Sequence, residues 1–242
     1  MRVELLNVGW ISSAAGIWRR GASRTRNIRF PVPAYVIETE TERILVDTGL
    51  HPDAVGHRAH RYGADAALGP VALELPASVA EQVEVEALTK VVLTHLHYDH
   101  AGGLALLPSW LPVVVQRREW EAGLDRAASA RNYFHEVDYA FAAERVELVD
   151  GDCNLVPDGS VRLLWTPGHT PGHQSVRIGE QLVIGGDVSH FAAGFDDHRF
   201  PIFGDDFVAQ AASAERLRAL RDEGVTVLPG HDPEVLEPRR HL

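Results

Sequence analysis

The sequence has one cysteine, one lysine and a deficit of positive charge. A single cysteine, Cys153, excludes an internal disulfide and a zinc site built from several thiolates. Lysine and arginine together number 23 against 34 aspartates and glutamates, so the formal net charge is −11. Such a chain is a poor match for nucleic acid or an anionic membrane surface, because both are bound mainly through clustered cations. We therefore expect a small-molecule partner.

Long apolar runs are also absent. No window approaches the roughly 18 consecutive apolar residues that a transmembrane helix needs. Glu4 and Asn7 interrupt the apolar stretch that a signal peptide would require near the start. With the lone cysteine, these features predict a cytoplasmic protein. The composition, 45% hydrophobic and 24% charged, is typical of a globular protein, and we assign residues 1–242 to one domain.

Short runs of β-branched and aliphatic residues alternate with helical stretches. The predicted strands cover residues 2–8, 34–38, 43–47, 90–95, 112–116, 146–150, 161–166, 174–179, 182–187 and 225–230. The predicted helices cover residues 77–88, 117–124 and 206–222. Because several strands follow one another as hairpins, a purely parallel sheet is excluded. We expect an α/β fold in which two mixed β-sheets pack face to face with helices outside.

Two stretches, 10–33 and 51–70, show no periodicity and are predicted to be long functional loops. Residues 51–70 suit either a lid or the arm of a homodimer. Aromatic residues in loop-like stretches could line an apolar trough for a substrate; they are Trp10, Trp18, Phe134, Phe191 and Phe195.

The chain has 13 histidines, more than core packing usually requires, and several are clustered. The densest cluster is the segment HLHYDH (95–100), which follows a predicted buried strand. Residues two apart in an extended segment face the same side, so His95 and His97 can reach one metal ion. A turn after His97, which the glycines at 102 and 103 permit, would direct Asp99 and His100 toward a second point.

Three further candidates lie at strand ends or at Gly/Pro turns. His169 lies in TPGHTPGH, Asp187 follows LVIGG, and His231 lies in LPGHDP. In open α/β folds, ligand sites gather at the loops that follow strands. The whole set comprises five imidazoles and two carboxylates, which suit zinc, manganese, iron or cobalt.

The order of these residues resembles that of the metallo-β-lactamase superfamily, and the resemblance extends from LVDTG (45–49) to PGHD (229–232). It implies an αββα sandwich with a dinuclear metal centre in the cleft between the sheets. It assigns one divalent ion, most simply zinc, to His95, His97 and His169, and a second to Asp99, His100 and His231, with Asp187 bridging. Asp47 would either orient the ligand loop or cap a turn.

Within the superfamily, several segments look like those of the N-acyl-homoserine lactone lactonases; they are residues 35–49, 95–103, 115–124 and 166–175. This likeness implies opening of a lactone ring by a metal-bridging hydroxide, with Asp99 carrying a proton to the departing alkoxide. The lactonase pattern has a tyrosine three residues after the bridging aspartate, where this chain has His190. Its imidazole N–H could donate to the substrate carbonyl oxygen, the substrate could differ, or His190 could lie at the surface.

Three alternatives remain open at this point. The same fold could hydrolyse another lactone, a thioester, a phosphotriester or a β-lactam. A mononuclear iron persulfide dioxygenase would require that Asp99, His100 and His231 bind no metal. A metal-stabilised binding protein would have no open coordination position.

Overall fold

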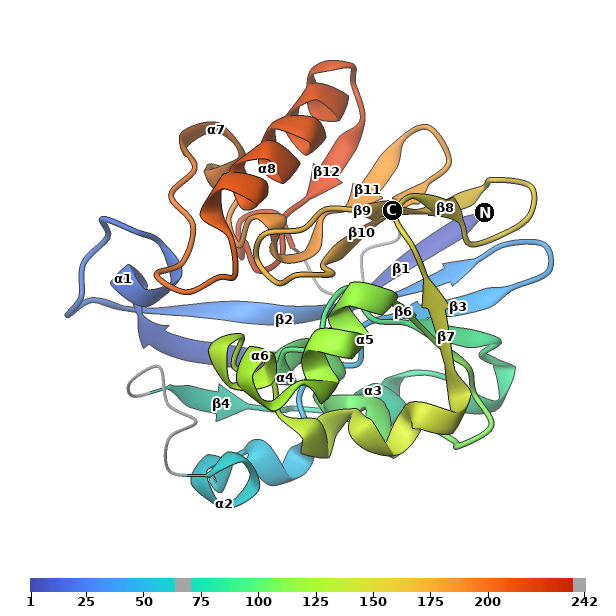
Figure 1. Cartoon of the computed structure of the whole chain (residues 1–242), viewed down its shortest axis with the longest axis horizontal. Helices are drawn as coiled ribbons and strands as arrows, with labels where there is room; N and C mark the ends of the chain where they lie inside the picture. Colours follow the sequence, from blue (N-terminus) through green and yellow to red (C-terminus); the bar gives the residue numbers. More distant parts are fainter. Residues whose placement is uncertain (64–70, 237–242) are drawn as a thin grey trace.

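The computed structural model describes residues 1–63 and 71–236, and its strands form two sheets (Figure 1). The seven-stranded sheet has the order β4-β1-β2-β3-β5-β6-β7. Its strands are β1 (Arg2–Ala14), β2 (Asn27–Glu38), β3 (Arg43–Val46), β4 (Ala72–Glu74), β5 (Lys90–Val92), β6 (Val113–Gln116) and β7 (Val146–Val149). The five-stranded sheet has the order β12-β11-β10-β9-β8. Its strands are β8 (Cys153–Asn154), β9 (Val161–Trp165), β10 (Gln174–Ile178), β11 (Leu182–Ile184) and β12 (Thr226–Leu228).

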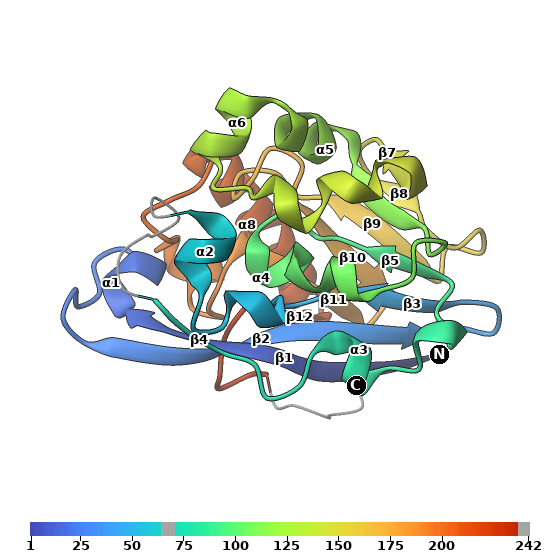
Figure 2. The same ribbon diagram turned by 90° about the horizontal axis from the view of Figure 1, so that it is seen from below.

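Helices cover the outer faces of both sheets (Figures 1 and 2). The α-helices are α1 (Ala15–Trp18), α2 (Arg58–Tyr62), α3 (Val79–Gln82), α4 (Tyr98–Ala101), α5 (Arg117–Leu124), α6 (Arg126–Arg131), α7 (Gly194–Asp197) and α8 (Phe207–Asp222). Short 3-10 helices cover Pro52–Ala54, Val85–Ala87, Gly102–Leu106, Glu136–Asp138, Ala140–Arg145 and Gly186–Val188. Within residues 1–63 and 71–236, none of the helices has the length and apolar character needed to span a membrane.

The apolar core is divided into three layers, as an αββα sandwich requires. Ile44 of the seven-stranded sheet and Leu163 of the five-stranded sheet belong to the layer between the sheets. Trp120 of α5 belongs to the layer on the outer face of the larger sheet. Leu217 of α8 packs with Val183 on the outer face of the smaller sheet. Each sheet thus buries both faces, and the predicted fold class is confirmed.

The prediction of a loop over residues 10–33 is wrong. Strand β1 continues to Ala14, β2 begins at Asn27, and the two strands pair as a long antiparallel hairpin. The register shifts between Asn7 and Trp10. A bulge of this kind changes which side chains face inward, and so it breaks the alternation by which a strand is recognised in a sequence.

Two other predictions change in detail. The helix expected over 77–88 is divided into α3 and the 3-10 turn Val85–Ala87. A capping box between Ser78 and Glu81 fixes the start of α3. Within the stretch 51–70, the structure has a 3-10 turn and α2. The remainder of that predicted loop, residues 64–70, lies outside the described residues.

Backbone hydrogen bonds join the segment 48–49, which follows β3, to residues 100–103, which lie beyond β5. The Thr48 N–H and hydroxyl both donate to the His100 carbonyl oxygen, at 2.7 and 2.8 Å. The Gly103 N–H donates to the Gly49 carbonyl oxygen at 2.9 Å. A Cβ atom on Gly103 would stand 2.2 Å from the Thr48 carbonyl oxygen. Only glycine therefore permits this approach of the two backbones.

Replacing Gly103 by alanine should lower the free energy of unfolding by about 1–3 kcal/mol, because a backbone oxygen must move away from the new methyl group. Chemical denaturation measures the change. The exposed Ala105, in the same 3-10 helix, provides the control, and Ala105→Ser should stay within about 0.5 kcal/mol of the parent. A Gly103→Ala protein as stable as the parent would show that the contact is not a constraint.

Candidate metal centre

Each of the seven histidine and aspartate residues singled out in the sequence lies just beyond the end of a strand. The segment 95–100 follows β5, His169 follows β9, Asp187 follows β11 and His231 follows β12. The strands predicted over 90–95 and 182–187 end earlier, at Val92 and Ile184. Residues 93–95 and 185–187 therefore belong to loops, and these loops place His95 and Asp187 in the interior. All seven residues are buried.

These loops bring the seven side chains into two groups. In the first group, one ligand-type atom from each of His95, His97, His169 and Asp187 lies within 4.8 Å of the others. In the second group, Asp99, His100 and His231 meet the same limit. The turn into α4 separates the groups, since His97 has extended backbone whereas Asp99 and His100 are helical.

A hydrogen bond fixes which ring nitrogen of His97 carries a lone pair. His97 Nε2 lies 2.8 Å from the Asn132 carbonyl oxygen, which can only accept, so a neutral His97 has its lone pair on Nδ1. That Nδ1 lies 2.9 Å from His95 Nε2 and 3.0 Å from His169 Nε2. Burial and the neighbouring imidazoles lower the pKa of His95 and His97 well below the usual value. Neutral nitrogens that converge in this way are suited to a shared cation.

In the second group, the lone pair of an imidazole nitrogen faces carboxylate oxygens. His231 Nδ1 donates to the Pro31 carbonyl oxygen at 2.9 Å, so a neutral His231 has its lone pair on Nε2. That Nε2 lies 3.2 Å from Asp187 Oδ1 and 3.6 Å from Asp99 Oδ2. Burial disfavours the charged imidazole, but the carboxylates of Asp187 and Asp99 together raise the pKa of His231 above its usual value. The position between these atoms therefore favours a positive charge, whether a proton or a metal ion.

Asp47 both caps a loop and orients a histidine. Its Oδ1 accepts the Thr94 N–H at 2.7 Å, and its Oδ2 accepts the Thr94 hydroxyl at 2.8 Å. The same Oδ2 lies 2.8 Å from His100 Nδ1. The two roles left open for Asp47 in the sequence therefore occur together. A carboxylate partner of this kind fixes the tautomer and orientation of a metal-binding imidazole.

Glu119, on α5, was not identified from the sequence. Its two carboxylate oxygens accept the Leu96 N–H at 3.0 Å and the Gly172 N–H at 2.8 Å. Burial raises the pKa of Glu119 to about 7, against the opposing effect of these hydrogen bonds. Glu119 thus joins the loop of His95 and His97 to the loop of His169. One feature of the sequence could have identified Glu119: it lies one helical turn before Gly123, on the same side of α5 as Trp120, where a charged residue is unexpected.

His173 was also missed, and it holds the backbone of Asp187. Its Nδ1 donates to the Thr166 carbonyl oxygen at 3.1 Å, and its Nε2 accepts the Asp187 N–H at 2.9 Å. Burial lowers the pKa of His173 to about 3, so the imidazole is neutral, as both hydrogen bonds require. The motif TPGHTPGH therefore contains one histidine of the cluster, His169, and one that positions the cluster.

Several polar atoms of the cluster are buried without a hydrogen-bond partner among the described residues. They are His100 Nε2, His169 Nδ1, Asp187 Oδ1, both ring nitrogens of His190, and His231 Nε2. An unsatisfied buried polar group costs roughly 1–3 kcal/mol. Cations held by the two groups would satisfy three of these six atoms: His100 Nε2, Asp187 Oδ1 and His231 Nε2. The residues therefore fit two metal ions.

A pocket of about 380 Å³, counted with its open mouth, leads to the cluster. At its base lie His97, Asp99, Asp187 and His190. Its walls are Trp18, Arg58, Tyr98, Tyr133, His135 and Phe203. Of the five aromatic residues predicted to line a trough, only Trp18 lines this pocket.

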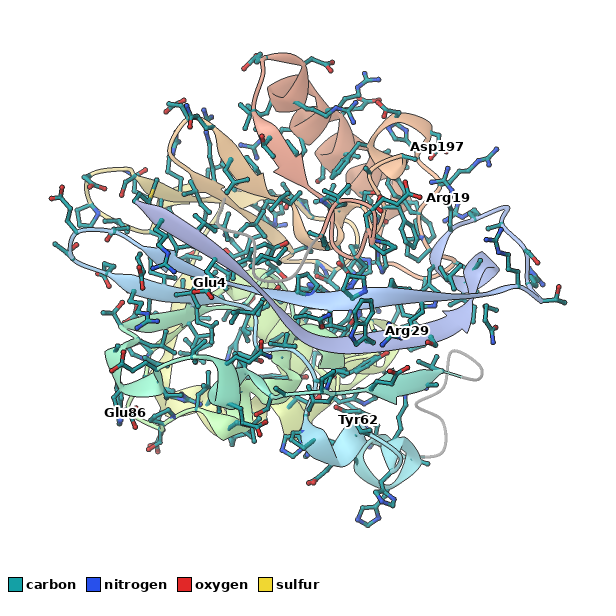
Figure 3. The ribbon with its side chains drawn as sticks, turned by 180° about the vertical axis from the view of Figure 1, so that it is seen from behind. Glu4, Arg19, Arg29, Tyr62, Glu86 and Asp197 are labelled. Atoms are coloured by element: carbon teal, nitrogen blue, oxygen red, sulfur yellow. The ribbon has the colours of Figure 1, made fainter. Side chains whose placement is uncertain are left out.

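The other four aromatic residues have different surroundings. The Phe134 ring lies 5.6 Å from the His97 ring, and Phe195 is buried in the core beneath α8. Phe191 packs against Phe30, and Trp10 lies under the guanidinium of Arg29, which Figure 3 labels.

The hairpin that carries Trp18 is tied to the segment that carries Phe203. Arg19, which follows α1, forms an ion pair with Asp197 at the end of α7, and Figure 3 shows the two side chains facing each other. The Ile202 N–H donates to the Ile17 carbonyl oxygen at 2.9 Å. Trp18 and Phe203 are thereby held at a centroid distance of 5.4 Å.

Comparisons with known proteins agree on one family. The family model for the metallo-beta-lactamase superfamily matches residues 27–231. The N-acyl homoserine lactonase of Bacillus thuringiensis is 33% identical over 218 residues, which are 86% of this chain and 83% of that protein. The N-acyl homoserine lactonase AttM of Azorhizobium caulinodans is 26% identical over 97% of this chain and 94% of its own length.

Solved structures give the same result. An N-acyl homoserine lactone hydrolase with N-hexanoyl-L-homoserine bound at its catalytic metal center has a TM-score of 0.82 and 28% identity. The alignment covers 96% of this chain and 94% of that one. A mutant of AiiA from B. thuringiensis, with N-decanoyl-L-homoserine bound at the active site, also has a TM-score of 0.82 and 28% identity, and covers 96% of this chain and 94% of its own.

Replacing Glu119 by glutamine should weaken Zn²⁺ binding by the group of His95, His97 and His169 by about 10–100-fold. The amide keeps one acceptor oxygen and places an NH₂ group against the second loop N–H, so one of the two loops loses its anchor. Titration of the metal-free protein against a chromophoric chelator measures the change. Glu121→Gln is the control, since Glu121 is exposed on the same helix. Equal affinities for the two variants would show that Glu119 does not position the loops.

Proposed function

Because the chain belongs to the metallo-beta-lactamase superfamily and, within it, to the family of the N-acyl homoserine lactonases, we propose that it opens the lactone ring of N-acyl homoserine lactones by metal-dependent hydrolysis. The observation that carries the proposal is the position of Asp187. Its carboxylate lies against both groups of buried imidazoles, at the base of a pocket with aromatic walls. The persulfide dioxygenase alternative has less support, because Asp99, His100 and His231 form a second complete group.

We propose two divalent ions, most simply zinc, with iron, cobalt or manganese as alternatives. His95, His97 and His169 would hold one ion, Asp99, His100 and His231 the other, and Asp187 would be shared. When bound, such ions lower the pKa of water toward neutrality and polarise an ester carbonyl. Asp47, Glu119 and His173 would hold the ligands in place through the contacts described above.

We assign proton transfer and binding of the acyl chain to different side chains of the pocket. Asp99 lines the pocket beside the cluster, which suits it to deliver a proton to the ring oxygen as the carbon–oxygen bond breaks. Water adds its OH to the carbonyl carbon, and the ring oxygen leaves as an alcohol, so the product is an N-acyl homoserine. Trp18 and Phe203 would contact the acyl chain and exclude water from it. The partner is a small molecule, and the lone cysteine supports a cytoplasmic location.

The proposal predicts that the zinc-loaded protein converts N-hexanoyl-L-homoserine lactone to the ring-opened acid, with release of one proton per turnover near neutral pH. A pH-stat follows the proton, and mass spectrometry detects the addition of one water. Removal of metal should abolish turnover, and zinc should restore it.

A panel of other substrates separates this proposal from its rivals. A phosphotriester, a thioester and a β-lactam test the alternative hydrolases. Turnover of one of these with homoserine lactones left intact would reject the proposed substrate class. One iron per chain together with oxygen uptake would reject the dinuclear hydrolase altogether.

A further inference from the structure

His190 is buried with its ring directed at the proposed metal centre. It follows Asp187 by three residues and is 2% exposed. Its ring centroid lies 5.3 Å from that of His169 and 5.0 Å from that of His231. On the other side Trp18 packs against it, at a centroid distance of 5.5 Å. The alternative of a surface histidine is therefore wrong.

The distances from His190 to Asp187 match those of the proposed ligands. His190 Nε2 lies 3.4 Å from Asp187 Oδ2. The corresponding distances to the same oxygen are 3.3 Å for His169 and 3.6 Å for His100. Neither ring nitrogen of His190 has a hydrogen-bond partner among the described residues, so the approach to Asp187 is not a hydrogen bond.

A shared cation explains such a distance. Zinc binds imidazole nitrogen and carboxylate oxygen at about 2.1 Å, so two neighbouring ligands of one ion lie about 3.0–3.4 Å apart. One ligand atom from each of Asp187, His190 and His231 lies within 4.8 Å of the other two. These three side chains thus form a third ligand set, which shares Asp187 with the first group and His231 with the second.

We infer that His190 Nε2 is an additional ligand of the ion held by His231 and Asp187 in the substrate-free protein. The inference rests on the proposed metal centre and concerns a residue outside the seven-ligand set. It also departs from the role expected from the sequence. A ligand needs a lone pair on Nε2, whereas donation to a carbonyl oxygen from that atom needs a proton there.

The variants His190→Phe and His190→Tyr test this inference through metal binding rather than turnover. Both remove the imidazole, and tyrosine restores a hydrogen-bond donor at the position where lactonases have one. We expect the weaker of the two Zn²⁺ dissociation constants to rise at least about 10-fold in both variants, with the tighter site little changed. We also expect the visible absorption of the protein loaded with two equivalents of Co²⁺ to change in both.

His60→Tyr provides the matched control, because His60 is exposed on α2 and should leave both measurements unchanged. His190→Ala separates loss of a ligand from misfolding. If the ring is a ligand, added imidazole should fill the vacated position and restore the Co²⁺ spectrum of this variant, which a misfolded protein would not allow. Unchanged affinity and spectrum in both the Phe and Tyr variants would overturn the inference. So would a failure of imidazole to restore the spectrum of a folded His190→Ala protein.

The inference and the proposed function fail in different ways. If the variants lose the second ion but the parent protein opens no lactone, the proposed function is wrong and the ligand assignment stands. If the parent opens lactones and His190→Phe lowers turnover while it keeps both ions, His190 is a hydrogen-bond donor and the ligand assignment is wrong.

Discussion

The crowding of imidazole nitrogens around one buried carboxylate is the constraint on which the rest of the structure depends. Five Nε2 atoms lie 3.2–3.7 Å from the oxygens of Asp187; they belong to His95, His100, His169, His190 and His231. Lone pairs at these distances repel one another unless positive charge lies between them. Divalent cations supply that charge, and the surrounding residues then serve mainly to keep the atoms from moving apart.

The sandwich supplies the two halves of this cluster from different sheets. The larger sheet provides the segment 95–100 after β5, whereas the smaller sheet provides His169, Asp187 and His231. Metal binding would therefore link the two sheets at the edge where both sets of strands end, and it would contribute to stability as well as to chemistry. Glu119 makes the same connection without metal, since its carboxylate binds one loop from each sheet.

The sequence was informative about the segment 95–100 because its spacing is local and its residue types are rare in combination, whereas His169, Asp187 and His231 were grouped with it by their order along the chain. The segment 95–100 by itself predicts that His95 and His97 face one metal ion while Asp99 and His100 face a second. Glu119 and His173 could not be predicted in the same way, because each binds backbone groups of loops that come together only in the folded chain. The pocket walls were mostly missed, since Tyr133 and Phe203 meet only in the folded chain. The hairpin over 10–33 was missed because a bulge hides its alternation.

Buried carboxylates near the ligands, rather than the net charge of the chain, balance the cations of such a centre. Two divalent ions carry four positive charges, and four carboxylates lie on or beside the ligands; they are Asp47, Asp99, Glu119 and Asp187. Without the ions, burial raises the pKa of Glu119 to about 7. Nearby cations favour the ionised form, which is also the form that accepts both loop N–H groups. Metal binding and loop anchoring therefore reinforce each other, and the net charge of the chain says little about the charge at its centre.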